Sequence, residues 1–309
     1  AYRNVGSVSN SGLELTIDTK NIQTKEFSWT SSFNISFNRN KVLSLNDDEP
    51  SLASRVNWGN FNNAYPYIAI PGHPIAMFYG HIFDGVYQYT DFDKVGESYI
   101  LKDGVPNNGN AREKIQPGDI KFKDINRDGV VNDYDLTIIG NPNPKHIGGF
   151  GNNFQYKNFD LNVFFQWSYG GDVLNANRIE FEGGDPNART SLNMFASFAN
   201  RWTPENQTNE LYRIGGQGPA VYSSRTIEDG SFLRLKTVSL GYRLPNAWLK
   251  KINIKSLRVY ASAQNLITWT RYSGPDPEVS TRPTALTPSF DWSPYPRPRT
   301  LTLGVDISF

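Results

Sequence analysis

Apolar and polar residues alternate with a period of two in several stretches of the chain. In residues 27–38, aromatic and aliphatic side chains occupy most odd positions, whereas Ser, Thr and Asn occupy the even positions. Residues 159–169 and 301–309 show the same alternation, and residues 13–17 form a shorter example. Alternation of this kind predicts β-strands with one apolar and one polar face.

Further stretches predict strands through a weaker pattern. They are residues 148–156, 232–244 and 257–263. In the second of these, the apolar positions slip by one residue after Leu235, which predicts a β-bulge near Lys236 and Thr237. The chain therefore predicts about seven strands and an all-β fold.

The connections between these strands alternate between short and long. The short polar links lie at about 19–25, 157–158 and 245–255. The long connections lie at about 39–147, 170–231 and 268–298. This asymmetry is typical of transmembrane antiparallel β-barrels, which combine short periplasmic turns with long extracellular loops. A soluble sandwich more often keeps its loops short at both ends.

Composition fits the barrel and excludes other classes. The chain has 31 Lys and Arg against 30 Asp and Glu, so it lacks the broad basic surface that a nucleic-acid binder uses. Without Cys there is no disulfide, thiolate metal site or cysteine nucleophile. No continuous stretch of apolar residues approaches the length of roughly 20 that a membrane-spanning helix needs. The mean hydropathy of −0.52 coexists with 7 Trp, 16 Tyr and 19 Phe, as expected when an aromatic lipid-facing side is averaged with a polar lumen and long loops.

Short stretches along the whole chain carry a family resemblance. They are residues 10–15, 78–80, 84–88, 117–121, 139–142, 201–206, 232–236, 240–242 and 264–266, together with the terminal Phe309. In this order they resemble the C-terminal barrel portion of SusC/RagA-type TonB-dependent transporters of Bacteroidota. A final alternating strand that stops on Phe309 also resembles the assembly signal of outer-membrane barrels. Trp29, Trp167 and Trp269 are then expected at lipid-facing or girdle positions.

The resemblance implies a fold larger than this chain. The family barrel has about 22 strands around an N-terminal plug, so residues 1–309 are expected to be a C-terminal segment from which the plug, the TonB-contacting segment and the signal peptide are absent. Seven strands do not close a barrel of that diameter.

The resemblance also implies a function. It is the import of oligosaccharides or peptides by an integral outer-membrane transporter, in contact with outer-membrane lipid and capped by a SusD-like surface lipoprotein. The TonB complex would supply energy through the missing N-terminal part. No nucleic-acid partner and no enzymatic activity are expected.

An Asp-rich segment matches the EF-hand loop template. The template places oxygen ligands at loop positions 1, 3, 5, 7, 9 and 12 and Gly at position 6, which is Gly129 here. Position 12 carries Asp instead of the usual Glu. The predicted calcium ligands are Asp124, Asn126, Asp128, the carbonyl of Val130, Asn132 and Asp135. The alternative is a cluster of Asx-turns without a metal.

Other interpretations stay open from sequence alone. One is a soluble or surface calcium-stabilised β-sandwich that binds carbohydrate. Another is an enzyme such as a calcium-dependent glycoside hydrolase. Glu180, Glu182 and Asp185 form a local acidic cluster that could mimic a glycosidase carboxylate pair, although solvated loop charges explain that cluster more simply. Aromatic residues of the long loops could stack on a ligand, but packing within the loops is favoured. These are Trp202, Tyr212, Tyr222, Trp292 and Tyr295.

Overall fold

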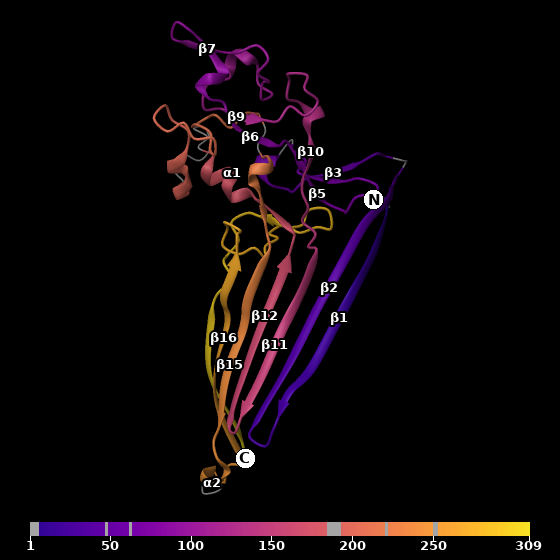
Figure 1. The fold of residues 1–309 in the computed structure, drawn as a ribbon, viewed down its shortest axis with the longest axis vertical. Coiled ribbons are helices and arrows are strands. Elements are labelled where there is room, and N and C mark those ends of the chain that lie inside the picture. Colours follow the sequence, from indigo (N-terminus) through magenta and orange to yellow (C-terminus); the bar gives the residue numbers. More distant parts are fainter. Residues whose placement is uncertain (1–5, 47–48, 62–63, 184–192, 220–221, 250–252) are drawn as a thin grey trace.

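A seven-stranded antiparallel sheet forms the long part of the molecule (Figure 1). The computed structural model describes residues 6–46, 49–61, 64–183, 193–219, 222–249 and 253–309. The strands, in sheet order, are β1 (Gly6–Gln23), β2 (Phe27–Leu45), β11 (His146–Tyr156), β12 (Phe159–Tyr169), β15 (Phe232–Arg243), β16 (Ser256–Thr270) and β18 (Thr300–Ser308). These are the seven strands that the alternation predicts, so the all-β prediction is confirmed.

The register of the sheet gathers the apolar positions on one face. One row of paired residues crosses all seven strands: Ile22, Trp29, Phe154, Leu161, Leu240, Ala261 and Leu303. Leu240 is 50% exposed and Leu303 is 86% exposed. A sandwich would bury this face beneath a second sheet, so the β-sandwich alternative has no support in the described residues.

One polar side chain on the apolar face is covered by its neighbours. Asn152 lies opposite Val163 and Ser31 in the sheet, on the apolar side, yet it is only 8% exposed. Its Oδ1 accepts hydrogen bonds from Trp29 Nε1 at 2.9 Å and from Ser31 Oγ at 2.7 Å. A buried amide needs such partners because desolvation without them is costly.

The predicted bulge is confirmed at Lys236. Leu235 pairs with Phe165 and Thr237 with Phe164, so Lys236 has no partner on β12. On the β16 side the register also shifts, and Asn265 lies within this irregularity with a φ of 53°. Asn is one of the few residues that tolerate this left-handed conformation. The bulge keeps apolar side chains on one face on both sides of the slip.

The short and long connections lie at opposite ends of the sheet (Figure 1). The tight turns, the helix α2 (Asn246–Leu249) and the C-terminus share one end. At the other end, β1 and β2 stay paired up to Gly6 and Leu45, so β2 continues past Arg39, where the sequence predicts a loop. Main-chain pairing does not need apolar side chains, which lets this polar stretch extend the strand.

The described residues of the long connections fold into a body that we call the head (46–145, 170–231 and 271–299). It contains a four-stranded sheet, a three-stranded sheet and two two-stranded sheets. Its elements are β3 (Leu52–Ser54), β4 (Tyr67–Ala69), β5 (Met77–Gly80), β6 (Phe83–Val86), β7 (Phe92–Val95), β8 (Ser98–Leu101), β9 (Ile120–Phe122), β10 (Thr137–Gly140), β13 (Asp172–Asn175), α1 (Ala176–Glu182), β14 (Ile227–Asp229) and β17 (Phe290–Asp291). Short 3-10 turns connect them: Gly59–Phe61, Tyr89–Asp91, Arg112–Lys114, Asp133–Asp135, Ala196–Asn200 and Ser224–Thr226.

Shared hydrophobic cores join the three long connections. One core combines Trp58 and Phe78 from the first connection with Leu174 from the second and Phe290 from the third. A second core brings Trp202 of the second connection against residues of the first. The connections therefore form one packed structure rather than separate loops. Within the described residues, no helix has the length and apolar character needed to cross a membrane.

Candidate functional site

The Asp-rich segment folds as a tight loop held by its own side chains. Asp124 accepts the backbone N–H groups of Arg127 at 2.6 Å and Gly129 at 2.8 Å. Three further side chains each accept a hydrogen bond from the backbone N–H two residues further along the chain: Asn126, Asp128 and Asn132. Gly129 has a φ of 85°, which a residue with a side chain rarely adopts. The loop is thus a series of Asx-turns.

Asp135 ties the end of this loop to its start. The side chain is fully buried, and it accepts N–H groups from Ile125 at 2.7 Å and Asn132 at 2.9 Å. Val131 is also buried and packs in the second hydrophobic core of the head. Val131 therefore anchors the loop to the rest of the head, whereas Asp135 closes the loop on itself.

The donor set suits a hard cation by its chemistry. Carboxylate, amide and carbonyl oxygens are the ligands that calcium prefers, and a carboxylate oxygen that accepts one N–H keeps a further acceptor site. Across the described residues, no group of three or more His, Asp or Glu side chains converges as a preformed metal site. The predicted ligands lie in one loop, and whether they bind calcium stays a proposal.

The loop aromatics are mostly packing residues. Trp202 is 5% exposed and Tyr212 is 6% exposed, both within the second core. Tyr222 and Trp292 pack against the first core. Tyr295 is 92% exposed. The packing interpretation fits the first four residues, whereas Tyr295 alone presents its ring to solvent.

The acidic cluster does not resemble a catalytic pair. Glu182 is bound by Arg178 at 2.9 Å, by Arg225 at 2.7 Å and by Ser197 Oγ at 2.7 Å. Burial would raise the pKa of this carboxyl, but these hydrogen bonds and the two arginine charges outweigh burial and lower it. A general acid needs the opposite shift. Glu180 has partners of its own, and Asp185 lies outside the described residues.

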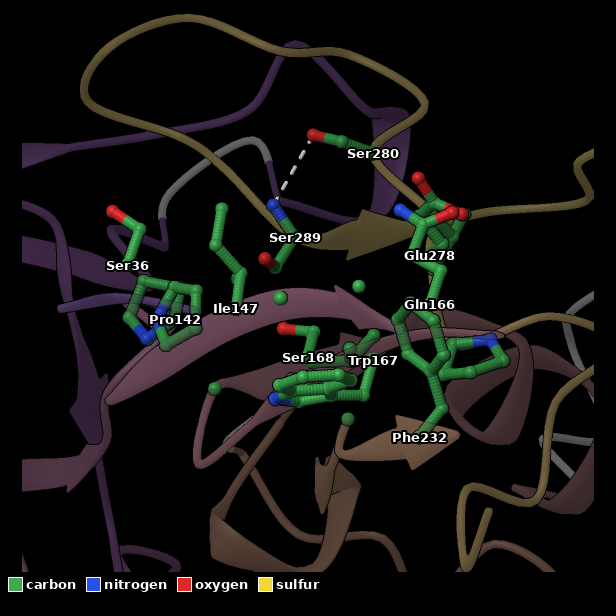
Figure 2. Close-up of a pocket in the computed structure, with 18 of the residues that line it drawn as sticks. Ser36, Pro142, Ile147, Gln166, Trp167, Ser168, Phe232, Glu278, Ser280 and Ser289 are labelled. Carbon is green, nitrogen blue, oxygen red and sulfur yellow. Dashed lines mark hydrogen bonds between the residues drawn. The ribbon is translucent and has the colours of Figure 1, made fainter. Parts of the chain in front are cut away.

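A cavity of about 860 Å³ lies where the polar face of the sheet meets the head (Figure 2). Asn34, Gln166 and Ser168 line it from the sheet, while Ser280 and Ser289 line it from the connection between β16 and β18. Figure 2 shows this connection across the cavity from Gln166 and Ser168, with Ser289 N–H donating to Ser280 Oγ at 3.1 Å.

A buried arginine holds that connection against the sheet. Arg234 of β15 is completely buried, and its Nη2 lies 2.6 Å from Asp276 while its Nη1 lies 3.4 Å from Glu278. Arg297 adds a second cation, 3.7 Å from Asp276 and 2.9 Å from Glu278. Two positive and two negative side chains therefore neutralise one another at the edge of the cavity.

A second charge cluster crosses the polar face near the short-turn end. Arg258 of β16 reaches Asp160 of β12 at 2.6 Å and Asp306 of β18 at 3.2 Å. To reach Asp160 it passes over Gly241 of β15, where an added Cβ would lie 2.4 Å from the guanidinium. The close approach of Arg258 thus explains why a glycine occupies position 241. The charges of this cluster are paired with one another, as they are around Arg234.

Sequence reasoning missed two residues of this face. Phe164 interrupts the polar positions of β12, and its ring lies across Gly149 of β11, where an added Cβ would be 2.8 Å away. An aromatic residue at an otherwise polar position, beside glycines on the neighbouring strand, is the signal that could have found it. Arg234 carried no such signal, because its acidic partners lie more than 40 residues further along the chain.

Comparison with known proteins decides the relationship. No family model matches the chain. TonB-dependent receptor P3 of Formosa agariphila is 35% identical over 312 residues, which cover 99% of this chain and 29% of that protein. TonB-dependent receptor SusC of Bacteroides thetaiotaomicron is 30% identical over 315 residues, which cover 99% of this chain and 27% of SusC. The match to the structure of the RagAB peptide transporter covers all of this chain and 30% of the transporter chain, with a TM-score of 0.74 and 26% sequence identity.

The resemblance to SusC/RagA-type TonB-dependent receptors is confirmed. The chain spans less than a third of the length of the curated receptors it matches. Its seven-stranded sheet is a section of a larger transmembrane receptor barrel. In such a barrel the apolar face meets lipid and the polar face lines the lumen. The cavity beside Gln166 lies on the polar face of the sheet.

Proposed function

We propose that this chain is part of a TonB-dependent active transporter of the outer membrane that imports oligosaccharides or peptides. The observation that carries the proposal is the whole-chain match to TonB-dependent receptors, combined with a sheet whose apolar face is exposed or only partly covered along most of its residues. Water is a poor environment for such a face, and lipid is a good one.

Each region then has a part in transport. The apolar rows anchor the barrel in lipid, the polar face lines the route of the ligand, and the head forms part of the outer mouth. A SusD-like surface lipoprotein closes over that mouth, and the TonB complex supplies energy through a segment outside this chain. The role is binding and gating without bond chemistry, which agrees with the paired state of Glu182.

Fractionation and uptake test the proposal together. The whole transporter that contains this chain should be recovered in the outer-membrane fraction. Its deletion should abolish growth on, or uptake of, one class of oligosaccharide or peptide, and removal of TonB should have the same effect. Recovery in the soluble fraction, or uptake that persists without TonB, would contradict it.

We also propose that the Asp-rich loop binds one structural calcium ion through the six predicted ligands, from Asp124 to Asp135. The ion would neutralise carboxylates packed into one turn and stiffen the loop. After treatment with a chelator, calorimetry of the whole transporter in detergent should show at least roughly tenfold weaker calcium binding in Asp128→Ala, since that variant loses a charged ligand.

Asp133→Ala is the matched control for the calcium test. Asp133 belongs to the same loop, is exposed and occupies no ligand position of the template. Its loss should leave calcium binding unchanged. Equal binding by wild type and Asp128→Ala would remove the calcium assignment and leave the metal-free Asx-turn cluster.

A further inference from the structure

The cavity on the polar face has an aromatic platform. Phe164 projects from the polar face of β12 and is partly exposed. Its ring lies across β11, because Gly149 on that strand leaves room: an added Cβ at Gly149 would be 2.8 Å from the ring, whereas one at Gly151 would make an ordinary contact at 3.6 Å. The absence of a side chain at Gly149 therefore lets the phenyl ring lie against the wall of the sheet.

Neutral hydrogen-bonding groups surround this platform. Asn34 and Gln166 flank Gly149 in the same row of the sheet, on β2 and β12. Ser168 continues the wall, and Ser280 lines the opposite side of the cavity. Amides and hydroxyls both donate and accept, so this lining matches a ligand that carries many hydroxyl groups.

The charged groups at the cavity are already engaged. Glu278 and Arg297 pair with each other and belong to the neutral cluster around Arg234. Asp172 accepts the N–H of Asn141 at 2.7 Å, and burial raises the pKa of its carboxyl. Among the described residues that line the cavity, there is thus no uncompensated cation for an anionic ligand and no separated pair of charges for the two ends of a peptide.

We propose that this cavity is a luminal subsite for a neutral oligosaccharide, with one sugar ring stacked on Phe164 and its hydroxyls bound by Asn34 and Gln166. The inference rests on the proposed transport function and narrows its ligand class. Small-ligand sites commonly combine an apolar surface with a few convergent polar groups, and an aromatic ring adds large contact area at low conformational cost.

The test is ligand binding by the whole transporter, purified in detergent. The probes are neutral gluco-, xylo- and manno-oligosaccharides, an anionic oligouronide and a tryptic peptide digest. At least one neutral oligosaccharide should bind, and Phe164→Leu should raise its Kd at least about tenfold. Phe165→Leu is the matched control, because the adjacent side chain faces the lipid side and should leave the Kd unchanged.

Gln166→Ala is a second variant that keeps the test decisive if Phe164→Leu fails to assemble. It should weaken binding of the same oligosaccharide severalfold, while the heat-dependent gel migration of the barrel stays unchanged. Failure of every neutral probe to bind, or binding that is insensitive to Phe164 and Gln166, would overturn the inference. Binding of only the peptide or the oligouronide through Phe164 would also overturn it.

These outcomes separate the subsite from the transport function. If the whole transporter lies in the outer membrane and takes up its ligand through TonB, but its lumen binds no neutral sugar, the subsite proposal alone is wrong. Loss of outer-membrane localisation would remove the proposed function itself. In the ligand-free whole transporter, protection of the Gln166→Cys thiol from a water-soluble thiol reagent would show that the remainder of the protein fills the cavity, which also overturns the subsite.

Discussion

The long sheet and the head obtain their stability in different ways. In the sheet, each strand pairs with its chain neighbours and leaves an apolar face exposed, as at Leu303. In the head, strands of two to four residues are held by buried side chains from three separate connections, such as Leu174 and Phe290. The sheet depends on its surroundings to cover apolar surface, whereas the head covers its own. Substitutions should therefore affect the two regions independently.

The largest effect is expected in the head. Phe290→Ala empties a fully buried position that contacts residues of all three connections, and it should destabilise the head by about 3–5 kcal/mol. Pulse proteolysis of the head in the membrane-embedded protein measures this loss, while the heat-dependent gel migration of the barrel should stay unchanged. Tyr295→Ala, at an exposed position, is the control and should change neither the proteolysis of the head nor the gel migration of the barrel. Joint loss of head and barrel would mean that the regions are one cooperative unit.

A charge on the apolar face should harm the sheet and spare the head. Val238→Arg places a cation on the apolar face at the middle of β15, where this residue pairs with Val163, at a cost of about 2–4 kcal/mol near the bilayer midplane. Ser239→Arg is one residue away on the polar face and should cost far less. Equilibrium unfolding of the whole barrel in lipid compares the two variants. Equal costs would argue that both faces of β15 meet water.

A smaller, pH-dependent effect belongs to the head. The hydrogen bond from Ser197 and the charges of Arg178 and Arg225 lower the pKa of Glu182 despite burial. The stabilisation from Glu182 is thus complete above its ordinary pKa of 4.5 and is lost as the pH falls through the lower folded value. Buried Asp291 has a raised pKa and acts in the opposite direction, so the wild type must be compared with Glu182→Gln.

The expected outcome for this pair is a convergence at low pH. Proteolysis midpoints of the wild-type head should exceed those of Glu182→Gln at pH 7, and the difference should shrink below about pH 4.5. If the difference in proteolysis midpoint between the two proteins stays constant from pH 7 to pH 3, the charge of the Glu182 carboxylate contributes nothing to the stability of the head.

The smallest effect tests how the sheet satisfies a polar group on its apolar face. Trp29→Phe removes the N–H that donates to Asn152, at a cost of about 1 kcal/mol. A double-mutant cycle with Asn152→Ala isolates the interaction, measured by unfolding of the barrel in lipid. A coupling energy indistinguishable from zero would indicate that Ser31 alone satisfies this amide.

The same contrast explains what the sequence could predict. Strands of the large sheet follow from period-two alternation, and even the bulge at Lys236 is visible as a phase slip. The head has no such period: β13 and β17 pair in parallel through residues more than 100 positions apart, Leu174 and Phe290. Long-range pairing of short segments leaves no local pattern. Arg234 was missed for that reason, whereas Phe164 was visible as an exception within the polar face.

The orientation of β15 in the membrane tests the central claim most directly. The chain contains no native Cys, so single cysteines can carry spin labels at each position from 233 to 242 in the whole transporter, provided that the remainder also lacks reactive thiols. Accessibility to oxygen and to a water-soluble nickel complex should alternate, with positions 233, 235, 238, 240 and 242 facing lipid and the phase changing at Lys236. Uniform access of the nickel complex to both faces, or alternation without the phase change, would contradict a lipid-exposed barrel wall.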